Sequence, residues 1–101
     1  MITPLEHLSR NGRLGKFFID GQWLEPKGSA KGVVVNPATE ETVTQFALGN
    51  GEDVDAAVSA ARRAFATWGR TRPEYRAALL DRLQTLLEAR SELFAQCLSL
   101  E

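Results

Sequence analysis

The sequence has 101 residues, 44% of them hydrophobic and 25% charged, which is typical of a single small globular domain. Its 12 basic and 13 acidic side chains give a formal net charge of −1, and this balance argues against a nucleic-acid binder, which needs a basic patch to neutralise phosphates. Because no apolar run approaches the ~20 residues of a membrane span, no apolar targeting segment opens the chain, and one cysteine forms no internal disulfide, we expect a soluble cytoplasmic domain without membrane partners.

Residues 1–16 are predicted to form a short amphipathic arm. Thr3 and Glu6 have the spacing of a helix capping box, and Asn11-Gly12 is a stop signal for the turn. His7, the only histidine, lies in this arm, and we expect it to face solvent rather than to take part in catalysis.

A β-hairpin is predicted directly after the arm. Asp20-Gly21 separates two short apolar runs, and this dipeptide is the strongest short-range signal for a two-residue type I′ turn. The segment "KGSAKG" at 27–32 is predicted to be a flexible loop, because it lacks the Gly-Lys-Ser/Thr ending of a phosphate-binding loop.

A second pair of strands is predicted from Val33–Val35 and Thr42–Leu48. The first run is β-branched and the second alternates in polarity, while Asn36-Pro37 between them favours a turn. Two or three such strands need another element to cover them.

Three helices are predicted after residue 50. Asn50 is expected to cap the first, over 51–68, and Thr71, with Glu74 in a capping box, to cap the second. Ser91 is expected to cap a third helix that still continues at Glu101, without a stop signal, so we expect the chain to be a truncated segment. Apolar residues recur at helical spacing in all three: Val54, Ala57, Val58, Ala61, Phe65 and Trp68; Leu79, Leu80, Leu83, Leu86 and Leu87; Leu93, Phe94, Cys97 and Leu98.

No catalytic or metal-binding motif follows from the residues themselves. The one cysteine, Cys97, and His7 lie about ninety positions apart, no Cys-x-x-Cys or acidic cation loop occurs, and no glycine-rich dinucleotide turn is present. Helical spacing places Cys97 among apolar neighbours, so we interpret it as structural rather than nucleophilic.

Four stretches in order resemble the opening of an NAD(P)-dependent aldehyde dehydrogenase. They are "FFIDGQW", "VVVNPATEETV", "EDVDAAVSAARRAFATW" and "RPEYRAALLDRLQTLLEARSELFAQCLSLE". The resemblance implies an α/β fold in which N-terminal β-hairpins precede three α-helices, with residues 17–101 forming the first, incomplete part of a Rossmann-like cofactor-binding domain.

The same resemblance implies the chemistry of the family, which is oxidation of an aldehyde to an acid with NAD or NADP. The family's cysteine nucleophile, glutamate base, oxyanion-hole asparagine and nucleotide contacts would all follow Glu101, so no catalytic or cofactor-binding residue is assigned in this chain. The resemblance also implies a monovalent-cation site formed by the backbone carbonyls of Val34 and Val35 and the carboxylate of Glu101. It further implies a homo-oligomer that acts on a small-molecule aldehyde.

Two hypotheses remain open from the sequence. In the first, the chain is the N-terminal segment of an aldehyde dehydrogenase and is inactive alone. In the second, it is a stand-alone helical interaction module without catalysis, because its apolar helix faces would be exposed and would recruit partners.

Overall fold

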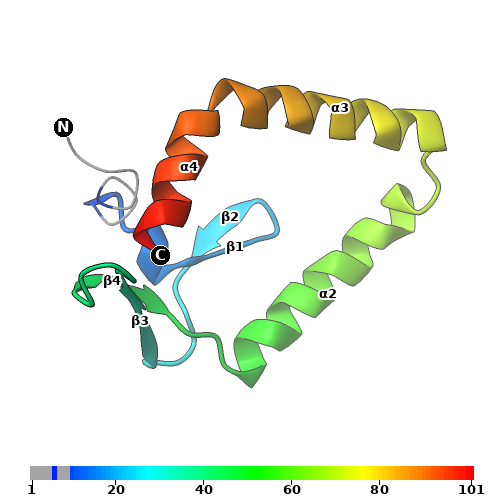
Figure 1. Ribbon diagram of the computed structural model, residues 1–101. Coiled ribbons are helices and arrows are strands. Elements are labelled where there is room, and N and C mark those ends of the chain that lie inside the picture. Colours follow the sequence, from blue (N-terminus) through cyan, green and yellow to red (C-terminus); the bar gives the residue numbers. More distant parts are fainter. Residues whose placement is uncertain (1–5, 7–9) are drawn as a thin grey trace.

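The computed structural model describes residue 6 and residues 10–101, and its strands all precede its three long helices (Figure 1). The predicted capping pair of Thr3 and Glu6 and the predicted position of His7 involve residues outside this described part. The elements, in chain order, are η1 (Arg13–Gly15), β1 (Phe17–Ile19), β2 (Gln22–Leu24), β3 (Lys31–Val35), β4 (Thr42–Ala47), α2 (Gly51–Trp68), α3 (Pro73–Ala89) and α4 (Ser91–Leu100). The prediction of hairpins followed by three helices is therefore confirmed.

The first hairpin pairs β1 with β2 in antiparallel register. Asp20 and Gly21 form its turn with φ values of 55° and 73°, so both central residues have the positive φ of a type I′ turn, and that prediction is confirmed. Phe18 pairs with Trp23 across the strands, and their ring centroids lie 5.1 Å apart. The guanidinium carbon of Arg13 lies 5.1 Å from the Trp23 ring, so η1 contributes a cation–π contact to this hairpin.

The second hairpin pairs β3 with β4 and begins earlier than predicted. Lys31 and Gly32, expected in a flexible loop, are strand residues that pair with Ala47 and Phe46. At Gly32 a Cβ atom would lie 2.5 Å from Cζ of Phe46, so the absent side chain leaves the space that the Phe46 ring occupies. The loop prediction was wrong at these two positions because the partner strand, and not the local glycine, determines the pairing.

Helix α2 begins and ends where the sequence predicts, but its predicted apolar face is only partly covered. Its alanine edge, formed by Ala57, Ala60, Ala61 and Ala64, lies against the β1–β2 hairpin, and Ala60 is buried there. Val54, Val58 and Phe65 remain exposed. The hairpin is too small to cover more than one edge of the helix, so the stripe of valine and phenylalanine side chains stays exposed.

Two predicted helix caps were wrong. Arg72 is the N-cap of α3, without a side-chain cap, and Pro73 is its first residue. The Thr71 hydroxyl instead donates a hydrogen bond back to the Trp68 carbonyl at 2.7 Å, and the residue before a proline favours the extended conformation that an N-cap needs. Helix α4 likewise has Arg90 as its N-cap, and Ser91 is already helical.

The molecule is open, with little interior of its own. Among the described residues only Ala60 forms a buried apolar core and only Asp53 is a buried charged residue. The radius of gyration is 16.7 Å, against about 13 Å for a compact chain of this length. The accessible surface is 8108 Å², against about 5,700 Å² for a compact monomer of this mass. The described elements therefore enclose almost no apolar core.

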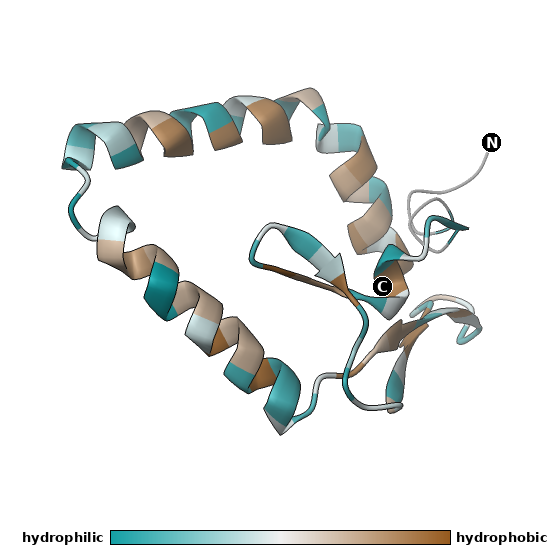
Figure 2. Ribbon diagram, turned by 180° about the vertical axis from the view of Figure 1, so that it is seen from behind, coloured by the Kyte–Doolittle hydropathy of each residue, from teal (hydrophilic) through white to brown (hydrophobic). Residues whose placement is uncertain are grey.

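The helices of this open arrangement carry hydrophobic residues along their length. Helices α2, α3 and α4 run in succession around the β1–β2 hairpin, and hydrophobic segments recur along each of them (Figure 2). No helix in the described part of the chain is both long enough and apolar enough to cross a membrane.

Candidate functional site

Val34 and Val35, two of the predicted cation ligands, lie at an irregularity at the end of β3. Val34 pairs with Thr44 and Val35 with Thr42, so β4 contains one additional residue, Val43, at this point. Such a bulge leaves the extra residue, Val43, outside the ladder, while Val34 and Val35 both keep partners on β4.

The turn that follows holds the end of β3 in place. The Asn36 side-chain oxygen accepts hydrogen bonds from the N–H groups of Ala38, at 2.9 Å, and Thr39, at 3.4 Å. The Asn36 N–H donates to the Glu41 carbonyl at 2.9 Å, and Glu40 has a left-handed φ of 62°. These contacts explain why an Asn-Pro dipeptide follows the strand.

Glu101, the third predicted ligand, lies at the C-terminal end of α4. Its N–H donates to the Cys97 carbonyl at 3.3 Å, and its side chain is exposed. Both ribbon views draw this end of α4 beside the strands (Figures 1 and 2). Within the described residues, no hydrogen bond or ion pair joins Glu101 to β3.

The donor set suits a hard cation but is incomplete. Two main-chain carbonyls and one carboxylate are all oxygen ligands, which is the chemistry that hard cations require. Three ligands are few for such an ion, however, and no group of three or more His, Cys, Asp and Glu side chains occurs in the described part of the chain. The cation site at Val34, Val35 and Glu101 stays a prediction.

Asp53 is a buried carboxylate with backbone hydrogen-bond partners on both oxygens, a role that the sequence analysis missed. Its Oδ1 accepts from the Lys27 N–H at 2.9 Å, and its Oδ2 accepts from the Asn50 N–H at 3.0 Å. The Asn50 side chain accepts in turn from the Asp53 N–H at 3.0 Å, which completes a capping box. The Asn-x-x-Asp spacing is the sequence signal for such a box.

The contacts of Asp53 are structural rather than catalytic. The buried carboxylate connects the loop after β2 with the start of α2, and both of its oxygens have protein partners. A small hollow of about 200 Å³ adjoins it, lined by Phe17, Ile19, Leu24, Glu25, Lys27 and Ala56. Because both Asp53 oxygens accept backbone N–H groups, Asp53 serves to hold the loop after β2 and the start of α2 together.

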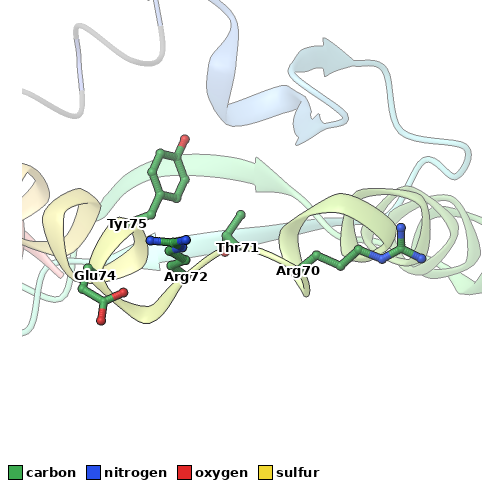
Figure 3. A pocket seen from close by; sticks show the side chains of 5 residues that line it. All are labelled: Arg70, Thr71, Arg72, Glu74 and Tyr75. Carbon is green, nitrogen blue, oxygen red and sulfur yellow. The ribbon is translucent and has the colours of Figure 1, made fainter.

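A hollow of about 730 Å³ lies at the corner between α2 and α3 (Figure 3). It is lined by Arg70, Thr71, Arg72, Glu74 and Tyr75. The side chains of Arg70 and Glu74 extend away from each other, which leaves the hollow wide and open to solvent (Figure 3).

The polar groups around this hollow support the corner between the helices. Arg76 donates from Nη1 to the carbonyl and to the hydroxyl of Thr71. Tyr75 contacts Trp68 edge to face at 6.3 Å between ring centroids. Half-buried Cys97 lies on a different helix, so the hollow contains no nucleophile and base in contact.

Comparison with known proteins identifies relatives of this chain. A family model described as "Aldehyde dehydrogenase family" matches residues 23–101. The chain is 44% identical over 86 residues to a 3-succinoylsemialdehyde-pyridine dehydrogenase of Pseudomonas sp, and 43% identical over 86 residues to a malonate-semialdehyde dehydrogenase of Halalkalibacterium halodurans. Each alignment covers 85% of this chain and 18% of the relative.

Solved structures show the same relationship. A crystal structure of a mutant of aldehyde dehydrogenase C from Pseudomonas syringae, in complex with NAD+ and octanal, matches with a TM-score of 0.84 and 49% identity. That match covers 87% of this chain and 18% of the other. An aldehyde dehydrogenase from Bartonella henselae matches with a TM-score of 0.81 and 35% identity. The chain thus spans less than a fifth of the length of these relatives.

Proposed function

Because the chain belongs to the aldehyde dehydrogenase family, we propose that it is the N-terminal segment of an enzyme that oxidises an aldehyde to a carboxylic acid with NAD(P)+. The observation that carries this proposal is the family match over residues 23–101, together with the TM-score of 0.84 to a structure that contains NAD+ and octanal. In this proposal residues 17–101 open the cofactor-binding domain, after an arm at 1–16.

The segment contributes structure to the enzyme rather than reactive groups. The described residues contain no nucleophile in contact with a base, and the one cysteine among them is half-buried in α4. The catalytic cysteine, the general base and the nucleotide contacts are assigned to the part of the enzyme that follows residue 101. The cofactor, when bound there, accepts the hydride that leaves the substrate carbon. The chain alone is therefore expected to be inactive.

Several finer features belong to the same proposal. The NAD+ in the Pseudomonas syringae structure supports NAD+ rather than NADP+ as the cofactor, and a small-molecule aldehyde is the proposed substrate. Val34, Val35 and Glu101 are proposed to hold a monovalent cation, which the oxygen donor set supports. A homo-oligomeric state and a cytoplasmic location complete the proposal, the location supported by the single cysteine and the balanced charge.

A fusion protein tests the proposal directly. The fusion is built on the Pseudomonas syringae enzyme with its catalytic cysteine intact. Its matched first segment is replaced by residues 17–101 of this chain, and NADH formation is measured with octanal. We expect the fusion to reduce NAD+ and the 101-residue chain alone to be inactive. A folded fusion without activity would contradict the proposal, and turnover by the isolated chain would contradict the assignment of catalysis to later residues.

The alternative is an interaction module without catalysis, favoured by the large number of exposed apolar side chains. It predicts that the chain is a discrete, monodisperse species alone and that the fusion is inactive. The same two measurements, size-exclusion chromatography and the fusion assay, therefore distinguish the two functions.

A further inference from the structure

We propose that Asn11 is a site of spontaneous deamidation, where the side-chain amide is converted to aspartate or isoaspartate, and that the helix cap at Asn50 protects the same Asn-Gly dipeptide there. The chain has three asparagines, at positions 11, 36 and 50, and the first and last of them precede glycine. The inference does not depend on the proposed function, because it rests on the local contacts of these three residues.

The reaction needs only the chain and water. The main-chain nitrogen of the next residue attacks Cγ of the asparagine, so an N–Cγ bond forms, the Cγ–Nδ2 bond breaks, and ammonia leaves with the proton of the attacking nitrogen. Water then opens the five-membered imide at either of its two carbonyl carbons, which gives aspartate or isoaspartate. Nothing is oxidised or reduced. Glycine favours the attack because it has no Cβ to obstruct it.

Asn36 lacks the nucleophile for this reaction. The next residue is Pro37, whose nitrogen belongs to the ring and has no hydrogen to lose. The Asn36 side-chain oxygen also accepts a hydrogen bond from the Ala38 N–H at 2.9 Å. Asn36 is therefore an unreactive reference within the same chain.

Asn50 is followed by the nucleophile, but its side chain is held in the cap of α2. Its Oδ1 accepts from the Asp53 N–H at 3.0 Å, and its own N–H donates to Oδ2 of Asp53 at 3.0 Å. Its ψ is −175°, which is extended. Ring closure requires the side chain to leave the Asp53 N–H and ψ to rotate out of the extended region, so the capping box has to open first. An opening that breaks a cap and leaves buried polar groups unsatisfied slows the reaction by at least about tenfold.

Asn11 has the same dipeptide in a much looser setting. Its Oδ1 accepts from the Arg13 N–H at 3.1 Å, and the residue is exposed, so water readily replaces this hydrogen bond. Nothing lies within 4 Å of a Cβ placed on Gly12. The element that follows, η1, has 3 residues, whereas α2 has 18. The side chain of Asn11 is therefore able to turn towards the Gly12 nitrogen without opening a long helix.

Isoaspartate at position 11 changes the connection between the arm and the first hairpin. It adds one carbon to the main chain, and the carbonyl that accepted the Arg13 N–H becomes part of that main chain. The Arg13 guanidinium carbon lies 5.1 Å from the Trp23 ring, so a shift at the start of η1 acts on this cation–π contact. We expect faster amide exchange over Arg13–Gly15 once the reaction has occurred.

Peptide mapping of the full 101-residue chain tests the proposal. The chain is incubated at mildly alkaline pH and digested after glutamate, which places the three asparagines on separate peptides, 7–25, 26–40 and 42–52. Mass spectrometry then gives the extent of deamidation at each site. We expect Asn11 to react at least about tenfold faster than Asn50 and Asn36 to stay unmodified. In concentrated urea, where the cap is lost, Asn11 and Asn50 are expected to react at similar rates.

Two pairs of variants assign the difference to the contacts described. Asp53→Ala removes half of the capping box and is expected to speed the reaction of Asn50 by about fivefold. The matched change Asp55→Ala, at an exposed position of the same helix turn, is expected to leave that rate unchanged. Asn11→Ser keeps an oxygen acceptor but forms no imide, so amide exchange over Arg13–Gly15 is expected to stay constant during incubation, in contrast to the unchanged chain.

Three results would overturn the proposal. The first is equal reaction of Asn11 and Asn50 without urea, whether the cap opens freely or gives no protection. The second is an unmodified Asn11 in a chain whose Asn50 reacts in urea. The third is an equal effect of Asp53→Ala and Asp55→Ala on the rate at Asn50. Circular dichroism of each variant, compared with its rate in urea, shows whether a faster reaction comes from local opening of the cap or from loss of α2.

Discussion

At the scale of single residues, Asp53 shows how one buried carboxylate connects two segments. It is 6% exposed, and its two oxygens accept N–H groups from positions 27 and 50, which lie on opposite sides of the β3–β4 hairpin in the chain. A helix cap usually satisfies only its own helix. Here the same side chain also fixes a loop 26 residues away.

Replacing Asp53 with alanine is expected to destabilise the segment by about 2 kcal/mol. The change removes the capping box and leaves the Lys27 N–H without its acceptor, and both effects have magnitudes near 1 kcal/mol or more. Urea unfolding of the covalent fusion gives the free energy, and amide exchange at Lys27 gives the local effect. Asp55→Ala, at an exposed position two residues on, is the matched control and is expected to change stability by less than about 0.5 kcal/mol. Equal effects of the two changes would contradict the assigned role.

Gly32 is a second residue that determines local structure, in this case because it has no side chain. Gly32→Ala would place a Cβ 2.5 Å from Cζ of Phe46, so the ring has to move from its place across the strand pair. We expect faster amide exchange throughout β3 and β4, and partial recovery when Phe46→Leu is added.

Gly51→Ala is the control for this change, since nothing lies within 4 Å of a Cβ at Gly51 and alanine is a better helix residue than glycine. Unchanged exchange in β3 and β4 after Gly32→Ala would show that the ring moves aside at no cost.

At the scale of elements, the small residues of α2 determine how closely the hairpin approaches. Ala60 is the buried apolar residue of the described chain, and the alanines around it line the hollow beside Phe18 and Asp20. The ion pair between Arg63 and Asp20 is exposed at both ends, with side-chain exposures of 64% and 70%. Such a pair contributes little to stability, so the close approach of helix and hairpin depends mainly on the small size of the alanines.

Ala60→Leu is expected to destabilise the contact between α2 and the first hairpin by about 1–3 kcal/mol, the usual cost of overpacking. Urea unfolding of the fusion and amide exchange in β1 and β2 measure the effect. Ala66→Leu, at an exposed position of the same helix, introduces the same side chain without a neighbour and is expected to be nearly neutral. A neutral Ala60→Leu would show that the hairpin adjusts freely to the helix.

At the scale of the whole molecule, the three helices are arranged openly and enclose little interior. The dimensions of 48 × 34 × 21 Å and the radius of gyration of 16.7 Å describe a frame of helices rather than a packed domain. Cooperative unfolding requires a shared interior. The described residues have only one buried apolar side chain to contribute to it.

The chain alone is therefore expected to bind a hydrophobic dye such as ANS strongly and to unfold without a sharp urea transition. The covalent fusion is expected to bind little dye and to unfold cooperatively, because its larger portion covers α2 and α3. The measurement compares the dye fluorescence of the two proteins at equal molar concentration. Weak dye binding and a sharp transition for the isolated chain would contradict the open arrangement.

Most of the local structure was predictable from the sequence because short-range signals determine it. Asp20-Gly21 requires a turn with positive φ, Asn50 caps a helix, and the helical spacing from Val54 to Trp68 sets the length of α2. The predictions were wrong where a residue bonds or pairs with a partner other than the one that its local sequence signal indicates. Thr71 bonds backwards to Trp68 instead of capping α3, and Gly32 joins a strand because it pairs with Phe46 of β4.

The sequence by itself determined which segments form helices and hairpins, and its motifs indicated the family, since both depend on neighbours within a few positions. Only the tertiary structure decided which apolar residues are covered. A helical repeat indicates that Val58, Ala60 and Phe65 belong to apolar surface, but burial depends on what lies opposite. In this chain the small β1–β2 hairpin covers the alanine edge alone, and the valine and leucine faces remain open because no element among the described residues covers them.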